Sequence, residues 1–327
     1  MFFRFKYLAL LFGLTLLLAG CSDDEDGPSE PTETGPEKME FEKVFDVSDL
    51  PDDLYRKQLD KVISAGEDTY IVVSFAQVVK IENGEAKIIE TSVSDIANTA
   101  DGMIYGIGRD PQVSSWKAVY YSTDEGDSFD YISKPLMDAG VNTYQRYPNK
   151  ILARKLNDGS YLMILMRAYE STSEGYTLHT DYYLESQDGI NWEYRDGKDP
   201  SNKHYEAMAI DDDGKVFYKV YEKNAYFGTD IILYRSDDKG RTAERVENVT
   251  TTKGSRIPMA VDHSGQLWSY KSRNTDEDEY NISKWDGSKW VDYKSYSGGQ
   301  ALAGSIMDFT DDNKIVYATF DGIYVER

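Results

Sequence analysis

Basic side chains recur near the ends of predicted strands, at similar distances from turn glycines. Four of them follow such a glycine by seven to nine residues: Arg109, Arg167, Lys223 and Arg273. Two more, Arg146 and Arg256, precede predicted strands. Because a guanidinium group presents a planar fork of donors that fits a carboxylate, converging cations would bind a small anionic group such as a sialic or uronic acid. The alternative is that they are ordinary surface cations, neutralised by nearby acidic loops.

Two alternating kinds of turn mark the strands that would position these residues. The first kind comprises Glu67-Asp68, Asp101-Gly102, Asn157-Asp158-Gly159, Asp213-Gly214, Ser264-Gly265 and Asp312-Asn313. The second kind comprises Asn83-Gly84, Asp124 to Gly126, Asp188-Gly189, Asp238 to Gly240 and Asp286-Gly287. Asp, Asn and Gly supply the backbone conformations of tight hairpin turns. Their strict alternation predicts a four-stranded unit repeated around a β-propeller.

The last predicted unit has three strands, because the chain ends soon after the strand at Gly322 to Val325. The segment Glu42 to Val47 can supply the missing outermost strand, which would protect the sheet edge and join the two ends of the ring. We therefore predict an all-β, six-bladed β-propeller over residues 41–327, closed by an N-terminal strand that completes the last blade. Five or seven blades are the alternatives, because residues 140–202 contain a long insertion.

Strand direction in a propeller decides which connections share a face. The turns from first to second and from third to fourth strand lie on one face, and all other connections lie on the opposite face. Loops from every blade converge on that second face, and ligands usually bind there, at the mouth of the central channel. The six basic residues are predicted to lie on it.

Four turns of the second kind share a serine, an aspartate and a glycine in similar order. They are Ser122 to Phe129, Ser186 to Trp192, Ser236 to Thr242 and Ser283 to Trp290. These segments resemble the Asp-box, or BNR repeat, of the sialidase-like β-propellers, and the resemblance covers most of the chain. It implies a six-bladed scaffold whose Asp-boxes are structural hairpins on the side away from the active site.

Ser255-Arg256-Ile257-Pro258 resembles the Arg-Ile-Pro motif whose arginine binds the substrate carboxylate in sialidases. The resemblance also implies a tyrosine nucleophile paired with a glutamate, for which Tyr205 and Glu206 are the candidates. Adjacent residues of a strand point to opposite sides, however, and the motif opens the fifth predicted blade instead of the first. We therefore expect non-catalytic binding of a glycan or another extracellular partner. The alternatives are a glycoside hydrolase or lyase of the exo-sialidase type acting on acidic sugars, and a structural or assembly propeller.

No metal or cofactor is expected, since His179, His204 and His263 fall in different units without metal-ligand spacing. The chain has 58 acidic and 36 basic residues, which gives a formal net charge of −22. This charge repels the phosphates of nucleic acids and anionic lipid surfaces. The recurring basic residues instead indicate a glycan, preferably an anionic sugar, or an extracellular protein as the expected partner. Nucleic acid is disfavoured, and the membrane would be contacted only through a lipid anchor.

Residues 1–20 resemble the signal peptide of a bacterial lipoprotein. Arg4 and Lys6 precede the apolar run Tyr7 to Leu18, which is too short to span a bilayer comfortably. Leu18-Ala19-Gly20-Cys21 matches the lipobox, which implies cleavage before Cys21 and its acylation. Residues 21–40 begin with an acidic run and are rich in Pro, Ser and Thr, a composition typical of a flexible tether. We expect an outer-membrane lipoprotein exposed at the cell surface, with a periplasmic location as the alternative.

Overall fold

A computed structural model describes residues 37–113, 117–133, 148–167, 170–171, 177–178, 181–195, 205–224, 228–251, 259–272, 279–297 and 306–327. Within these ranges the chain forms β-strands and one short 3₁₀ turn, η1 (Val47–Asp49). None of the described segments is a helix long and apolar enough to cross a membrane. The strands belong to the compact unit Pro36–Arg327.

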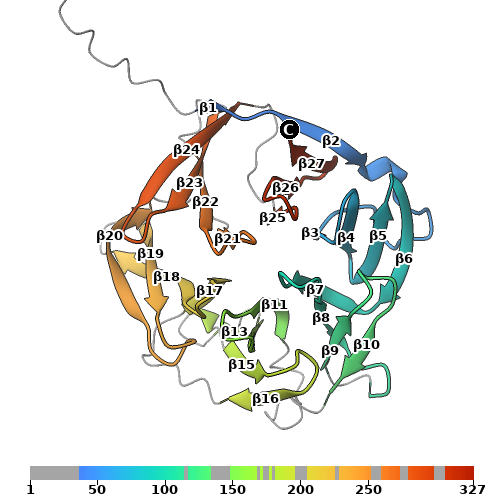
Figure 1. The fold of residues 1–327 in the computed structure, drawn as a ribbon, viewed down its shortest axis with the longest axis horizontal. Coiled ribbons are helices and arrows are strands. Elements are labelled where there is room, and N and C mark those ends of the chain that lie inside the picture. Colours follow the sequence, from blue (N-terminus) through green and yellow to red (C-terminus); the bar gives the residue numbers. More distant parts are fainter. Residues whose placement is uncertain are drawn as a thin grey trace, which may run out of the picture. The chain divides into compact units, whose positions relative to one another are not determined.

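Six antiparallel sheets of four strands surround a central axis, as Figure 1 shows. Blades 1 and 2 consist of β3 (Lys61–Ser64), β4 (Thr69–Ser74), β5 (Gln77–Glu82), β6 (Glu85–Thr91), β7 (Val93–Asn98), β8 (Ile104–Arg109), β9 (Lys117–Ser122) and β10 (Asp130–Ile132). Blades 3 and 4 consist of β11 (Pro148–Lys155), β12 (Tyr161–Arg167), β15 (Asp181–Ser186), β16 (Trp192–Arg195), β17 (Tyr205–Ile210), β18 (Val216–Asn224), β19 (Gly228–Ser236) and β20 (Glu244–Thr251). Blades 5 and 6 consist of β21 (Met259–Val261), β22 (Leu267–Ser272), β23 (Glu279–Trp285), β24 (Trp290–Ser297), β25 (Ile306–Phe309), β26 (Ile315–Ala318), β27 (Gly322–Glu326) and β2 (Phe41–Asp46). A small hairpin, β13 (Glu170–Ser171) with β14 (Thr177–Leu178), leaves blade 3 between β12 and β15.

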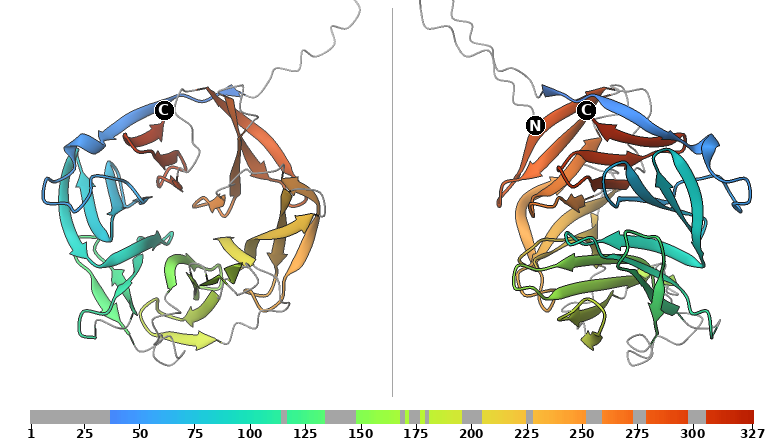
Figure 2. Two further views of the ribbon diagram at one scale, coloured as in Figure 1. Left: turned by 180° about the vertical axis from the view of Figure 1, so that it is seen from behind. Right: turned by 45° about the vertical axis from the view of Figure 1, so that its right-hand side comes forward.

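The N-terminal strand closes the ring. β2 pairs antiparallel with β27, from Phe41 opposite Glu326 to Asp46 opposite Gly322. Figure 2 shows β2, in blue, beside the red strands of blade 6. The predicted all-β, six-bladed propeller with an N-terminal closing strand is therefore confirmed.

A further pairing begins before β2. The two residues of β1 (Glu37–Lys38) pair in parallel with β24 and add a fifth strand to blade 5. Met39, directly after them, is buried against Trp268 and Met307, which belong to blades 5 and 6. The ordered ladder thus starts inside the stretch that the composition assigns to the tether.

Each interface between neighbouring blades is filled by its own cluster of buried apolar side chains. The alternation of side chains along a strand lets one strand serve two clusters. Tyr182 packs between blades 2 and 3, for example, whereas its neighbour Tyr183 packs between blades 3 and 4. Every blade therefore depends on both of its neighbours for burial of its two faces.

The serine and aspartate of the repeated turns hold the third and fourth strands together. In the turn between β19 and β20, the Ser236 hydroxyl accepts the Gly240 N–H at 2.8 Å and donates to Asp238 Oδ1 at 2.7 Å. Asp238 Oδ1 also accepts the Thr242 N–H at 2.8 Å. Equivalent bonds link Ser122, Asp124 and Gly126 in blade 2. These turns carry their own hydrogen-bond network and lie on one face of the propeller. We call the opposite face, which carries the connections from second to third strands and between blades, the loop face.

Candidate functional site

The loop face carries the connections from second to third strands and from one blade to the next. Arg109 ends β8, Arg167 ends β12 and Lys223 lies near the end of β18. Their backbones are therefore at the loop-face ends of second strands, as the sequence predicts. Arg146, Arg256 and Arg273 lie outside the described residues, as does Cys21. Arg109 is the member of the predicted set whose side chain the structure describes.

Arg109 lies in a pocket of about 480 Å³ on the loop face, between blades 1 and 2. The lining comprises Asp53, Tyr55, Phe75, Ala76, Gln77, Ser92, Ser94, Arg109 and Lys117. These residues come from the 47–60 loop, the β4–β5 turn, the β6–β7 connection and the ends of β8 and β9. The pocket is therefore built by two neighbouring blades and by the long loop that leads from blade 6 into blade 1.

Two aromatic rings stack at the edge of this pocket. The Tyr55 and Phe75 ring centroids are 4.8 Å apart, with an interplanar angle of 15°. Tyr55 and Phe75 are 73% and 41% exposed, whereas Tyr70, Tyr105 and Tyr120 of the nearby blade interfaces are buried. The Arg56 guanidinium lies 4.6 Å from the Phe75 ring centroid, which is within the range of a cation–π contact. An apolar, cation-flanked platform is thus presented to solvent.

Hydrogen bonds fix the backbone beneath the rings. The Tyr55 N–H donates to Gln77 Oε1 at 2.9 Å, and the Phe75 N–H donates to Asp60 Oδ2 at 2.8 Å. Phe75 and Ala76 form the β4–β5 turn with φ values of 43° and 64°, a conformation that costs free energy in residues other than glycine. Such conformations persist where the surrounding structure holds them, and they cluster at functional sites. The platform is therefore organised before any ligand arrives.

Two cations, Arg109 and Lys117, are among the lining residues of the pocket. The Arg109 N–H donates to the Ser92 carbonyl at 2.8 Å, and its own carbonyl accepts the Tyr120 hydroxyl at 2.6 Å. Lys117 pairs with Arg109 across β8 and β9 and is half-buried. Burial lowers the pKa of Lys117, and the positive charge of Arg109 lowers it further. An anion bound here would relieve the repulsion between the two side chains.

Glu206, one of the two residues considered for catalysis, is held in an ion-pair network. It is 8% exposed, and its carboxylate lies 3.1 Å from Lys150 Nζ and 2.9 Å from Lys219 Nζ. Burial by itself would raise the pKa of Glu206, but the two lysines outweigh it and hold the pKa below its usual range. For Tyr205 the structure describes only the backbone position, at the start of β17. Glu206 is therefore an ionised bridge between blades 3 and 4 and is not set up as a proton donor.

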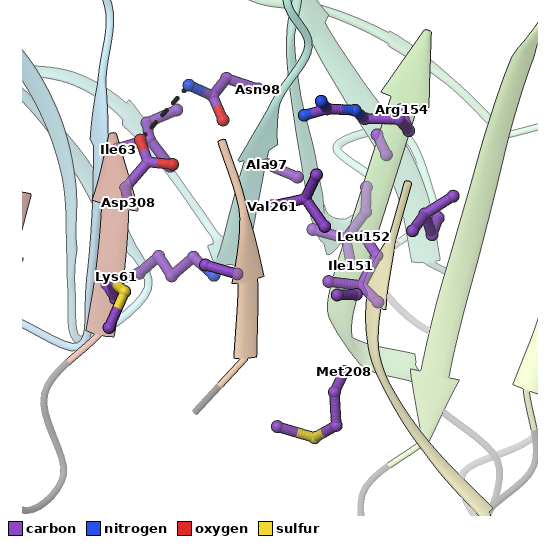
Figure 3. Close-up of a pocket in the computed structure, with 15 residues that line it drawn as sticks. Lys61, Ile63, Ala97, Asn98, Ile151, Leu152, Arg154, Met208, Val261 and Asp308 are labelled. Carbon is purple, nitrogen blue, oxygen red and sulfur yellow. Dashed lines mark hydrogen bonds between the residues drawn. The ribbon is translucent and has the colours of Figure 1, made fainter. Parts of the chain in front are cut away.

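The central channel narrows to a cavity of about 110 Å³, lined by the first strands of the blades (Figure 3). Asp308 Oδ2 of blade 6 accepts the Ser64 N–H at 2.7 Å and the Asn98 side-chain amide at 3.3 Å, which links blades 6, 1 and 2. Burial raises the pKa of Asp308, although the hydrogen bond from the Ser64 N–H and the charge of Lys61 oppose the rise. Figure 3 shows Lys61 extending into the channel and Arg154 on the opposite wall from Asp308.

Arg154 makes the corresponding link on the other side of the channel. Its Nε donates to Asp212 Oδ1 at 2.6 Å, and its Nη2 donates to the Asp262 carbonyl at 2.6 Å. Blades 3, 4 and 5 are thereby joined. Asp308 and Arg154 are engaged in hydrogen bonds between blades, which gives the axis a structural role. The pocket of blades 1 and 2 is therefore the better candidate for a ligand.

The sequence predicts Arg109 as a candidate but gives no sign of the aromatic platform or the axial links. Phe75-Ala76 lies between two apolar runs and contains neither glycine nor asparagine, so it gives no turn signal. Among the described residues, no group of three or more His, Cys, Asp or Glu side chains could hold a metal ion. His263 lies 3.2 Å from the Phe309 carbonyl, between blades 5 and 6, whereas His179 and His204 lie outside the described residues.

Comparison with known proteins supports the fold. No protein-family model matches the sequence, and no curated protein matches it significantly. A protein of unknown function from Dyadobacter fermentans is similar in structure, with a TM-score of 0.52, 14% identity and coverage of 88% of this chain and 98% of that one. A gluconolactonase from Xanthomonas campestris has a TM-score of 0.50 and 12% identity, covering 92% and 97% of the two chains. The α-L-arabinofuranosidase of Fusarium graminearum has a TM-score of 0.50 and 11% identity, covering 89% and 96%. At these identities the similarity establishes the β-propeller fold.

Proposed function

We propose that this protein is a lipid-anchored propeller that binds an acidic glycan on its loop face without cleaving it. The observation that carries the proposal is the exposed Tyr55–Phe75 stack beside Arg109 and Lys117. A flat aromatic face buries apolar area against the C–H face of a sugar ring. The two cations provide charge-assisted hydrogen bonds to a carboxylate or sulfate group. In a chain with a net charge of −22, such a paired positive site favours an anionic ligand.

Binding without catalysis is supported by the described carboxyl groups. Glycosidases generally need two carboxyl groups that flank the scissile bond. Among the described lining residues of the pocket, Asp53 is the one carboxylic acid. Glu206 is neutralised by Lys150 and Lys219 and is not among them. The gluconolactonase and the arabinofuranosidase that share the fold act on sugars by their names, which is compatible with carbohydrate recognition on this scaffold.

The location belongs to the same proposal. Residues 1–20 act as the signal peptide, Cys21 carries the lipid, and residues 21–40 tether the propeller at the outer surface of the outer membrane. Acyl chains contribute roughly 0.8 kcal/mol per buried methylene, so attachment through several chains is lasting. Replacing Cys21 with Ser should release the protein from the membrane fraction, and surface protease treatment of intact cells distinguishes the outer face from the periplasm.

The binding function is tested with the full-length protein purified in detergent and applied to an array of acidic and neutral glycans. We expect acidic glycans to bind, and both Tyr55→Ala and Arg109→Ala to weaken binding roughly tenfold, or about 1.4 kcal/mol. Arg241→Ala is the matched control, because it removes the same charge from the opposite face. Full affinity in the Tyr55 and Arg109 variants would overturn the site, and hydrolysis of sialosides or uronides by the wild type would overturn the non-catalytic assignment.

A further inference from the structure

A third exposed aromatic residue lies on the loop face in the neighbouring blade. Phe320 occupies the β26–β27 turn of blade 6 and is 76% exposed. This turn connects a second and a third strand, as the turn of Phe75 does in blade 1. The local sequences also correspond, because Ser74-Phe75 and Thr319-Phe320 each come directly after an apolar run of the second strand. Adjacent blades thus present a phenylalanine from the same position of their repeat.

The 47–60 loop connects these two turns. At its start the Val47 N–H donates to the Asp321 carbonyl at 3.1 Å, directly beside Phe320. At its end the Asp60 N–H donates to the Val73 carbonyl at 2.8 Å, two residues before Phe75. Tyr55 lies on the loop between these two attachments. The loop therefore runs from one exposed phenylalanine to the other and carries an exposed tyrosine on the way.

Buried residues of the same loop keep this arrangement in place. Leu50 and Leu54 are buried in the cluster between blades 6 and 1, together with Phe45 and Ile323. Ser74 Oγ donates to the Arg56 carbonyl at 2.6 Å, which attaches the loop to the end of β4. Tyr55 follows Leu54 directly, so the anchoring of one residue holds the next on the solvent side. The exposure of Tyr55 is thus a fixed property of the loop.

We infer that the loop face binds an extended anionic polysaccharide across blades 6, 1 and 2. We call Phe320, Tyr55 and Phe75 the aromatic track, and Arg109 with Lys117 form the cationic pocket at its blade 2 end. A single terminal sugar needs only the pocket and its adjoining stack, whereas Phe320 gains a role only if the ligand continues toward blade 6. Apolar contacts along the track bury sugar faces, and the cations bind a carboxylate or sulfate of the repeat.

This inference rests on the proposed function, so its test separates chain length from binding itself. The full-length protein in detergent is titrated with a disaccharide and an octasaccharide of polygalacturonate, and with a disaccharide and an octasaccharide of chondroitin sulfate. We expect the octasaccharide of the preferred series to bind at least tenfold more tightly than its disaccharide. Phe320→Ala should remove most of this gain and leave the disaccharide affinity unchanged, while Tyr55→Ala should weaken both.

The control is Ile190→Ala, which removes an exposed apolar side chain from the opposite face and should change neither affinity. Equal affinity for both lengths, together with an unaffected Phe320→Ala variant, would overturn the extended track while leaving the pocket intact. If the protein binds none of the four oligosaccharides and no glycan of the array, the proposed function itself is overturned. An Arg109→Ala variant that keeps full octasaccharide affinity would refute the claim that the cationic pocket binds a carboxylate or sulfate of the polysaccharide.

Discussion

The pKa of Lys117 in the pocket depends on its burial and on its neighbour Arg109. Lys117 is half-buried and lies across from Arg109, and both effects favour the loss of its proton. A bound anion has the opposite effect, because it stabilises the charged ammonium form. Proton uptake by Lys117 and anion binding are therefore linked, and we expect the proposed affinity for an acidic glycan to depend on pH through this side chain.

Since the pKa of Lys117 before any ligand binds lies below the usual value of 10.5, the lysine loses its charge at a lower pH than an exposed lysine does. Affinity for the acidic glycan should be full near neutral pH and fall as the pH rises through this lowered pKa. Titration calorimetry over the alkaline range measures it, and Lys117→Arg should remove most of the fall because arginine stays protonated. An identical pH profile in the two proteins would contradict the linkage.

At the scale of the element, the hairpin turns fix the blades against one another. Gly240 has φ of 86° in the β19–β20 turn, and a Cβ placed there would overlap Tyr183 Cε1. Tyr183 belongs to blade 3 and its hydroxyl lies 2.8 Å from that of Tyr218 in blade 4. The turn therefore packs on a hydrogen-bonded tyrosine pair of the adjacent interface. Gly287, with φ of 97°, occupies the equivalent turn of blade 5 and has open space around it.

The two glycines give a matched pair of substitutions. Gly287→Ala should cost only the left-handed backbone conformation, about 1–2 kcal/mol. Gly240→Ala should cost that amount and also the displacement of Tyr183, about 1–3 kcal/mol more for an overpacked core. Urea denaturation of both variants measures the free energies of unfolding. Equal losses of stability would show that the contact with Tyr183 does not contribute to the cost of the Gly240→Ala substitution.

The same turns explain how far the fold could be predicted from the sequence. Glycines such as Gly102, Gly159 and Gly214 adopt positive φ at the expected turns, so counting turns gave the blades and their order. The pocket could not be found that way, because Tyr55 and Phe75 meet Arg109 through tertiary packing of a loop and two blades. Phe75 also adopts positive φ without the residue types that normally signal it. Arg109 was identified from its distance to Gly102, but its neighbours needed the structure.

At the scale of the whole molecule, closure of the ring depends on both axial and peripheral links. Asp308 joins blades 6, 1 and 2 near the axis, and Arg154 joins blades 3, 4 and 5. At the periphery, β2 covers the edge of β27 and supplies Phe45, which is 4% exposed, to the cluster between blades 6 and 1. The 47–60 loop, which carries Tyr55, begins where β2 ends. The strand that closes the ring therefore also positions the loop that carries the middle residue of the aromatic track.

Removal of β2 tests whether closure of the ring depends on this strand. A chain that starts at Val47 lacks β1 and β2, so it uncovers the edge of β27 and removes Phe45 from the core. Loss of a buried phenylalanine side chain alone typically costs about 3–5 kcal/mol, and an unpaired edge strand invites aggregation. We expect a sharply lower Tm and oligomers in size-exclusion chromatography, whereas a chain that starts at Pro36 keeps both strands and should match the full-length protein. If the two truncated chains melt at the same temperature, the ring is closed by the contacts around its axis, and β2 contributes little to holding blades 6 and 1 together.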